Sequence, residues 1–182
     1  MRRVTWRRAV LASSLSLSVA VLSVAQAADV VRTPLPDGNP FPISAAVTVP
    51  AGFDTVYVSG ALPSVANKDA PKGSVEAYGD MAVQAESALT NIKASLAKLG
   101  LGMGDVVKMT VFMTADTTKD NKLDFAGLMT GYTKFFGTTE QPNKPARSAV
   151  QVAALVAPGA LVEIEVIAVK PHTTDKLRKT KR

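Results

Sequence analysis

The spacing of apolar residues alternates along this chain of 182 residues between a period of about two and a period of about 3.6. Residues 80–99 carry apolar side chains three or four positions apart, which predicts an amphipathic helix that stops at Gly100. Residues 122–136 repeat this spacing before Gly137, which predicts a second helix. Short segments rich in β-branched residues indicate strands at 55–59, 105–113, 144–152 and 161–169. These segments predict an α+β domain.

Turn signals suggest how the strands are paired. A weaker alternating segment at 44–49 precedes a turn at 50–52, which predicts a first hairpin with the strand at 55–59. The turn at 156–159 predicts a second hairpin between the last two strands. The order is then β-β-α-β-α-β-β, with two helices on one face of a mixed sheet of five or six strands. Because alternate strand residues are largely apolar, we expect the uncovered face to be buried against other copies in a closed oligomer.

The first residues predict export. Four arginines precede an uncharged segment, residues 9–24, and Ala25-Gln26-Ala27 fits a cleavage signal. The apolar segment is serine-rich and shorter than the roughly 20 residues that a membrane span needs. We therefore expect a signal peptide over 1–27, a mature chain without a membrane span, and a periplasmic or secreted location. Arg7-Arg8 leaves open whether export uses the general or the twin-arginine route.

Composition and charge together divide the rest of the chain into three regions. Residues 28–43 are rich in proline and predict an extended arm in which regular structure is not expected. Residues 44–170 form the predicted domain, and residues 171–182 form a basic, disordered tail. The net charge of +6 includes four leader arginines and a tail of +4, so the remainder carries −2. The predicted domain is therefore not basic, and binding of nucleic acid by it is not expected. The tail is either solvated or adheres to a polyanion.

Several kinds of chemistry are excluded by the residue types. The chain has no cysteine, which excludes disulfides, thiol catalysis and thiolate metal sites. His172 is its one histidine and follows Pro171 near the tail. Neither a histidine triad nor a clustered histidine metal site is expected.

One arginine and one glutamate near the starts of the last two strands are the best functional clue. The predicted hairpin would bring Arg147 and Glu163 close together. Strand alternation places Glu163 and Glu165 on one face and Val162, Ile164 and Val166 on the other. Two interpretations stay open: the glutamate face is solvated, or Glu163 lines a cleft with Arg147. The apolar stripe of the second helix, which includes Tyr132, likewise predicts core packing or a ligand contact by one aromatic residue.

Four segments together resemble the RidA (YjgF) family of reactive-intermediate deaminases, over roughly residues 44–170. They are Val58-Ser59-Gly60-Ala61-Leu62-Pro63, Gly100 to Phe112, Pro145-Ala146-Arg147-Ser148 and Val162 to Ala168. The resemblance implies a chorismate-mutase-like fold and a homotrimer whose sheets form an inner barrel, with three ligand clefts between adjacent subunits. It also implies cofactor-free hydrolysis of small enamines and imines of 2-keto acids, such as 2-aminoacrylate, to the keto acid and ammonia.

The resemblance assigns roles to individual residues. Arg147 matches the arginine that binds the substrate carboxylate, for which a guanidinium offers two parallel donors. Glu163 matches the glutamate that positions or activates water. Ser59 matches a cleft serine that orients substrate, and Gly60 would permit close approach.

The chain also departs from the family pattern. Ala149 stands where family members often carry a cysteine after Arg-Ser, and Met129 replaces a cleft asparagine. The position of the family's first-strand tyrosine falls near residues 44–46, where this chain has no aromatic side chain. The expected cleft is thus more apolar and suits either a bulkier imino acid or binding without fast turnover. The alternative function is a non-catalytic ligand-binding or holdase-like trimer of the same fold.

Overall fold

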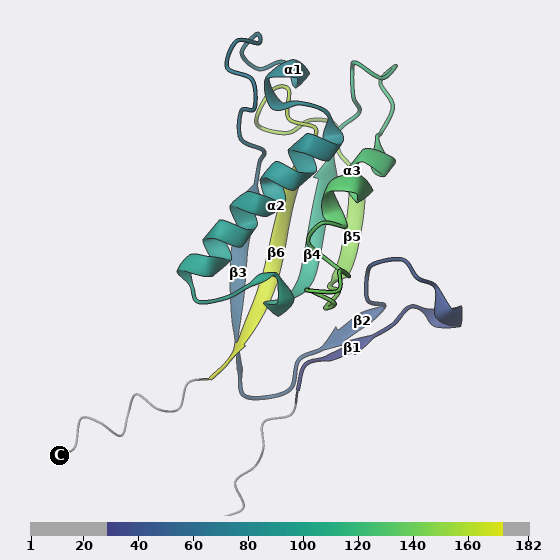
Figure 1. Ribbon diagram of the computed structural model, residues 1–182, viewed down its shortest axis with the longest axis vertical. Helices are drawn as coiled ribbons and strands as arrows, with labels where there is room; N and C mark the ends of the chain where they lie inside the picture. Colours follow the sequence, from purple (N-terminus) through teal and green to yellow (C-terminus); the bar gives the residue numbers. More distant parts are fainter. Residues whose placement is uncertain (1–28, 173–182) are drawn as a thin grey trace, which may run out of the picture.

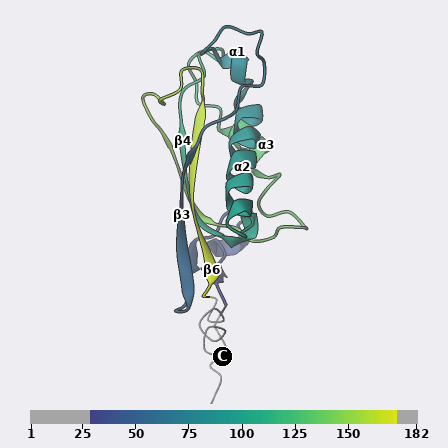
Figure 2. The same cartoon turned by 90° about the vertical axis from the view of Figure 1, so that its left-hand side faces the viewer.

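The structure is a computed structural model that describes residues 29–172. The predicted signal peptide and all but the first two residues of the predicted tail lie outside the described residues. Two helices cover one face of a four-stranded sheet, and the other face is open (Figures 1 and 2). The main elements are β3 (Phe53–Ala61), α2 (Met81–Lys98), β4 (Val106–Met113), α3 (Phe125–Tyr132), β5 (Ala146–Gln151) and β6 (Val162–Pro171).

The sheet has the strand order β3-β6-β4-β5. β6 is antiparallel to both of its neighbours, and β4 and β5 are parallel, so the expected mixed sheet is confirmed. The predicted hairpin between the last two strands is wrong, because β4 lies between β5 and β6. Residues 152–161 do reverse the chain, but they carry it past β4 to the gap beside β3. A turn signal in the sequence predicts where the chain reverses, but it does not predict which strand the returning segment pairs with.

A second, two-stranded sheet lies beside the end of the main one (Figure 1). β1 (Val31–Thr33) pairs with β2 (Ala46–Thr48) in antiparallel register, and the 3-10 turn η1 (Pro36–Gly38) lies between them. The predicted first hairpin is therefore wrong, the proline-rich arm contains unexpected regular structure, and the main sheet has four strands instead of five or six. The Arg32 guanidinium anchors β1 to the domain, since it donates to three backbone carbonyls, of Gly104, Val106 and Lys144, at 2.8–3.0 Å.

The predicted first helix is confirmed as α2. The Asp80 side chain caps it by accepting a hydrogen bond from the Val83 amide at 3.0 Å, and Gly100, with φ of 71°, follows its end. One stripe of α2 is fully buried against the sheet: Met81, Gln84, Ala85, Ala88, Leu89, Ile92 and Leu96. A short helix, α1 (Val75–Tyr78), precedes it within the long 61–79 segment.

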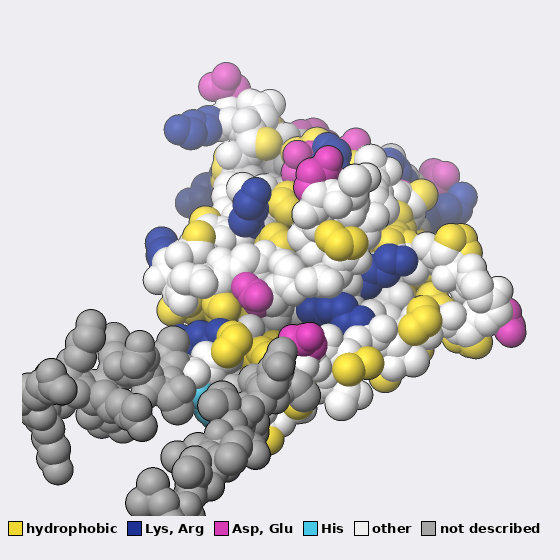
Figure 3. Space-filling view, turned by 60° about the horizontal axis from the view of Figure 1, so that its bottom comes forward, with side chains coloured by type: hydrophobic (Ala, Val, Ile, Leu, Met, Phe, Trp, Pro, Cys, Tyr) yellow, Lys and Arg dark blue, Asp and Glu magenta, His cyan; other side chains and the backbone are white. Residues whose placement is uncertain are grey.

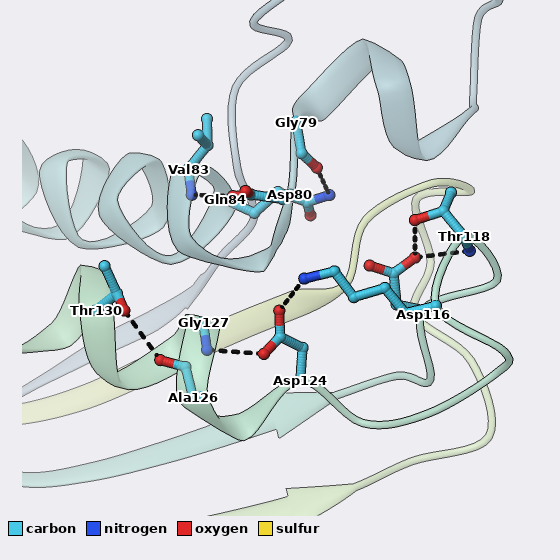
Figure 4. Close-up of polar contacts among 11 residues, drawn as sticks. Gly79, Asp80, Val83, Gln84, Asp116, Thr118, Asp124, Ala126, Gly127 and Thr130 are labelled. Carbon is cyan, nitrogen blue, oxygen red and sulfur yellow. Dashed lines mark hydrogen bonds and ion pairs between the residues drawn. The ribbon is translucent and has the colours of Figure 1, made fainter.

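The second helix is shorter than predicted. α3 begins after Asp124, whose carboxylate accepts a hydrogen bond from the Gly127 amide at 2.8 Å (Figure 4). Gly131 lies against α2 so closely that a Cβ there would be 2.8 Å from the Ala82 carbonyl oxygen. This glycine therefore lets α3 pack on α2, and the contact fixes where Met129 and Tyr132 lie.

Alternate residues on the strands separate the two faces of the sheet. The helix-covered face is apolar and buried, and it includes Met109, Val111, Met113, Ile164, Val166 and Ala168. The open face is mixed: Tyr57 is 78% exposed and Val150 46%, whereas Lys108 donates to the Ser148 hydroxyl at 2.9 Å. Figure 3 draws a different side, reached by turning the bottom of Figure 1 forward, and acidic, basic and hydrophobic side chains are interspersed there as well. Within residues 29–172, no helix has the length and apolar character needed to cross a membrane.

Candidate functional site

Arg147 projects from the edge strand β5 toward the helices. Its register partner on β4 is Met109, whose side chain is fully buried under the helices. The guanidinium carbon lies 4.3 Å from the ring centroid of Tyr132, 5.4 Å from that of Phe41 and 5.8 Å from that of Phe125. Three aromatic rings thus surround the cation at distances suited to cation–π attraction.

The two outer nitrogens of Arg147 meet a single weak acceptor. Nη1 and Nη2 each lie 3.4 Å from the Met129 sulfur, which comes from α3. No carboxylate of the described residues forms an ion pair with Arg147. A thioether accepts hydrogen bonds only weakly, so the two parallel donors remain available to a stronger acceptor.

Burial shifts the pKa values of Arg147 and Tyr132. Desolvation lowers the pKa of Arg147, and the nearby Tyr132 acts in the opposite direction. Burial raises the pKa of Tyr132 well above its ordinary value, although the Arg147 charge opposes this shift. Tyr132 therefore keeps its proton at neutral pH, and its hydroxyl donates to the Pro42 carbonyl at 2.8 Å. Arginine remains charged even with a lowered pKa.

Phe41 reaches the site because its neighbours are tied to the domain. Besides the bond from Tyr132 to Pro42, the Phe41 amide donates to the Asn39 side chain at 2.9 Å. The Ser44 hydroxyl donates to the Lys144 carbonyl at 2.7 Å. Phe41 was not predicted as a site residue, because it lies in the predicted arm and the family's aromatic position falls near residues 44–46. The available signal was an aromatic residue between two prolines, Pro40 and Pro42.

Glu163 lies on the open face of the sheet. It is paired in register with Phe112 on β4 and is half-buried, whereas Glu165 on the same face is exposed. Its side chain crosses Gly60 of β3, where a Cβ would be 3.0 Å from the Glu163 carboxyl carbon. The β3–β6 register shifts between Val58 and Ala61, so Ser59 and Gly60 form an irregular segment beside Glu163. Both residues are exposed.

The predicted site residues therefore form two groups. Arg147, Met129 and Ala149 lie on the helix side, and the last two pack against the core. Ser59, Gly60 and Glu163 lie on the open side. The expectation that one chain brings Arg147 and Glu163 together is wrong, because their register partners Met109 and Phe112 point to opposite faces. The shared face of Glu163 and Glu165 is confirmed.

Residues 73–76, in the segment between β3 and α2, border a hollow of about 380 Å³. This hollow is also lined by parts of residues 114–117 and 153–161, but by neither Arg147 nor Glu163. Among the residues that the structure describes, no cluster of three histidine, aspartate or glutamate side chains could hold a metal ion.

Comparison with known proteins gives consistent matches. A family model described as Endoribonuclease L-PSP matches residues 39–170. A RutC family protein of Haemophilus influenzae is 44% identical over 95 residues, which cover 52% of this chain and 68% of that protein. The 2-iminobutanoate/2-iminopropanoate deaminase of Escherichia coli K12 is 43% identical over 95 residues, with the same two shares.

The fold has a matching solved structure. It is the Rid family protein YyfB of Yersinia pestis, which superposes with a TM-score of 0.56 at 24% identity and covers 76% of this chain and 98% of its own. At this identity the likeness concerns the fold alone. It agrees with the mixed sheet and two helices described above.

Proposed function

The chain belongs to the RidA (YjgF) family, and on this premise we propose that it hydrolyses small enamines and imines of 2-keto acids to the keto acid and ammonia. The observation that carries the proposal is the Arg147 guanidinium, which is held among aromatic rings with both Nη atoms directed at a weak acceptor. The Escherichia coli relative is named for this activity on two such imines.

Arg147 binds the substrate carboxylate. A planar carboxylate replaces the Met129 sulfur and accepts two parallel hydrogen bonds from Nη1 and Nη2. The rings of Phe41, Phe125 and Tyr132 exclude water around the ion pair, which strengthens it. The substrate side chain meets mainly apolar neighbours, so we propose that imines larger than 2-aminoacrylate are preferred.

Glu163 holds the attacking water. Its carboxylate lies on the open sheet face against Gly60, and the hydroxyl of the preceding Ser59 orients the substrate. Since Arg147 points to the opposite face, one chain cannot supply both groups to one ligand. We propose that the cleft forms between adjacent copies of a homotrimer, with Arg147 from one copy and Glu163 from the next.

The location is part of the proposal. The arginine-rich start, the uncharged segment and the Ala25-Gln26-Ala27 signal support export to the cell envelope. There the substrates would be imines released by oxidation of amino acids. N-terminal sequencing of the protein from the envelope fraction tests this, with Ala28 as the expected first residue.

Keto-acid formation from imines tests the activity. An amino-acid oxidase generates 2-aminoacrylate-like and larger imines, and the rate with mature protein is compared with spontaneous hydrolysis. We expect Arg147→Lys to raise KM at least about tenfold and Glu163→Gln to lower kcat about a hundredfold. Glu165→Gln is the matched control, because Glu165 lies on the same face of the same strand, and it should leave the rate unchanged. Unchanged rates in the Arg147 and Glu163 variants would contradict the assignment.

Mixing the two impaired variants tests the shared cleft. If Arg147 and Glu163 of one site come from different copies, refolding equal amounts of Arg147→Lys and Glu163→Gln restores intact sites, about a quarter of the total in random trimers. If both groups came from one chain, mixing would restore none. Light scattering during gel filtration gives the mass of the assembly.

A binding protein without turnover is the second candidate. The observation that favours it is the contact of Met129 with Arg147, which places a thioether where the family pattern has an amide. Saturable binding of a 2-keto acid without any acceleration of imine hydrolysis would support this candidate. Acceleration by the wild-type protein would exclude it.

A further inference from the structure

Met129 differs in accessibility from the other methionines that the structure describes. The other four side chains are at most 6% exposed and lie in the core: Met81, Met103, Met109 and Met113. Met129 is half-buried at the edge of that core. A solvent-borne oxidant therefore reaches the Met129 sulfur more easily than the others, since methionine oxidation depends on access to the sulfur.

The Met129 sulfur also lies at a chemically sensitive position. It is the shared neighbour of Nη1 and Nη2 of Arg147, at 3.4 Å from each. A thioether there is a weak acceptor that a carboxylate can replace. A sulfoxide oxygen is a much stronger acceptor, and the same two donors would hold it.

We propose that Met129 is an oxidation site that controls ligand binding at Arg147. A lone pair of the sulfur attacks one oxygen of a peroxide, so that an S–O bond forms and the O–O bond breaks. The sulfur loses two electrons, and the second oxygen leaves as water after taking the proton of the transferred hydroxyl. The new sulfoxide oxygen accepts hydrogen bonds from the Arg147 guanidinium and competes with a substrate carboxylate. Reduction of the sulfoxide restores the thioether and the free donors.

The inhibitory part of this proposal rests on the proposed function, in which Arg147 binds a carboxylate. The oxidation itself and the new contact with Arg147 do not. The two parts therefore need separate measurements.

Peptide mass spectrometry after graded hydrogen peroxide tests the oxidation. In the folded protein, Met129 sulfoxide should accumulate well before sulfoxide at the four buried methionines, and this difference should vanish in denaturant. Equal oxidation of all five in the folded protein would overturn the proposal.

Calorimetric titration with 2-oxobutanoate tests the effect on binding. We expect affinity about tenfold weaker after oxidation, recovered by methionine sulfoxide reductase. The Met129→Leu variant, which keeps a similar volume without an oxidisable sulfur, should bind equally well before and after peroxide. Unchanged affinity in the oxidised wild-type protein would overturn the proposed competition.

Nitrogen-15 NMR separates this proposal from the proposed function. The Arg147 Nε–H signal, assigned by its loss in Arg147→Lys, should move on oxidation in wild type and stay fixed in Met129→Leu. Failure of the reduced protein to bind 2-oxobutanoate would count against the proposed function, whereas a signal that does not move would overturn the sulfoxide contact.

Discussion

The side chain of Glu163 on β6 lies directly across Gly60 on β3, in space that only a glycine leaves open. A Cβ at residue 60 would be 3.0 Å from the Glu163 carboxyl carbon and 3.1 Å from its Cγ. Gly60 therefore serves the placement of a carboxylate within its own chain, in addition to any close approach by a substrate. Gly60 also lies where the β3–β6 register shifts, between Val58 and Ala61.

Gly60→Ala should displace the Glu163 carboxylate without unfolding the protein. The clash is with a side chain that can rotate away, so the free energy of unfolding should change by less than about 1 kcal/mol. The rate of imine hydrolysis should fall roughly tenfold or more, because the water-holding group moves. Gly102→Ala is the control, since a Cβ there approaches only the Asp105 carboxylate, at 3.9 Å. Full activity of Gly60→Ala would show that the position of Glu163 is unimportant.

Tyr132→Phe should loosen the segment that carries Phe41. The Tyr132 hydroxyl donates to the Pro42 carbonyl, and its loss leaves that carbonyl without this donor at a cost of about 1–2 kcal/mol. Urea unfolding measures the cost, and amide exchange around residue 41 reports the loosening. Thr130→Ala is a suitable control on the exposed side of α3, since its hydroxyl bonds only within the helix. An unchanged exchange rate would show that the hydroxyl does not hold this segment.

The raised pKa of Tyr132 predicts a loss of stability at alkaline pH. Below about pH 10 the tyrosine is protonated in both the folded and the unfolded chain, and its titration contributes no pH dependence. Above that pH the unfolded chain releases the proton while the folded chain keeps it, so unfolding becomes more favourable as pH rises. This group contributes at most about 1.4 kcal/mol per pH unit. Tyr132→Phe should therefore lose less stability than wild type between pH 10 and 11.

Gln84→Ala should be the most destabilising single change considered. The buried Gln84 amide donates to the carbonyls of Gly79 and Gly159 and accepts from the Leu161 amide at 2.7 Å (Figure 4 shows the bond to Gly79). Three backbone groups lose their partner, which predicts a loss of about 3–5 kcal/mol in urea unfolding. Gln151→Ala, at an exposed glutamine, should change stability little. A loss below about 1 kcal/mol would mean that water replaces the amide.

Arg32→Ala should release the small β1–β2 sheet. Its guanidinium bonds to Gly104, Val106 and Lys144 join that sheet to the start of β4 and to the segment before β5. We expect amide exchange in Val31–Thr33 and Ala46–Thr48 to accelerate at least about tenfold while α2 stays protected. Thr33→Ala on the same strand, with an exposed side chain, is the control. Exchange as slow as in wild type would show that backbone pairing alone holds the sheet.

Periodicity predicted the helix-covered core well. The apolar spacing of α2 and the alternation along β4 and β6 follow from local geometry, and burial agrees with them at Leu96, Val111 and Ile164. Strand pairing was predicted poorly, because the partner of a strand depends on contacts far away in sequence. The last turn, at residues 156–159, reverses the chain, but β6 gains two neighbours in the middle of the sheet instead of one at its edge.

The arrangement of the candidate site was predicted only in part. Arg147 and Met129 do lie together, although sequence spacing gave no sign that the sulfur meets both Nη atoms. Arg147 and Glu163 were expected to be adjacent, but β4 lies between their strands. The two residues pair with β4 residues whose side chains point to opposite faces of the sheet. Phe41 was missed because its place depends on the hydrogen bond from Tyr132 of α3 to Pro42, which no local pattern reports.

The insertion of β6 between β3 and β4 also sets an order on the folding of a chain made from its N-terminus. Until Val162–Pro171 has been synthesised, β3 has no partner in the main sheet, and β4 can pair only with β5. The earlier segments cannot complete their sheet while they are still emerging, so the domain closes only when its last strand arrives. A nascent chain that stays open for so long remains accessible to any factor that binds unfolded polypeptide.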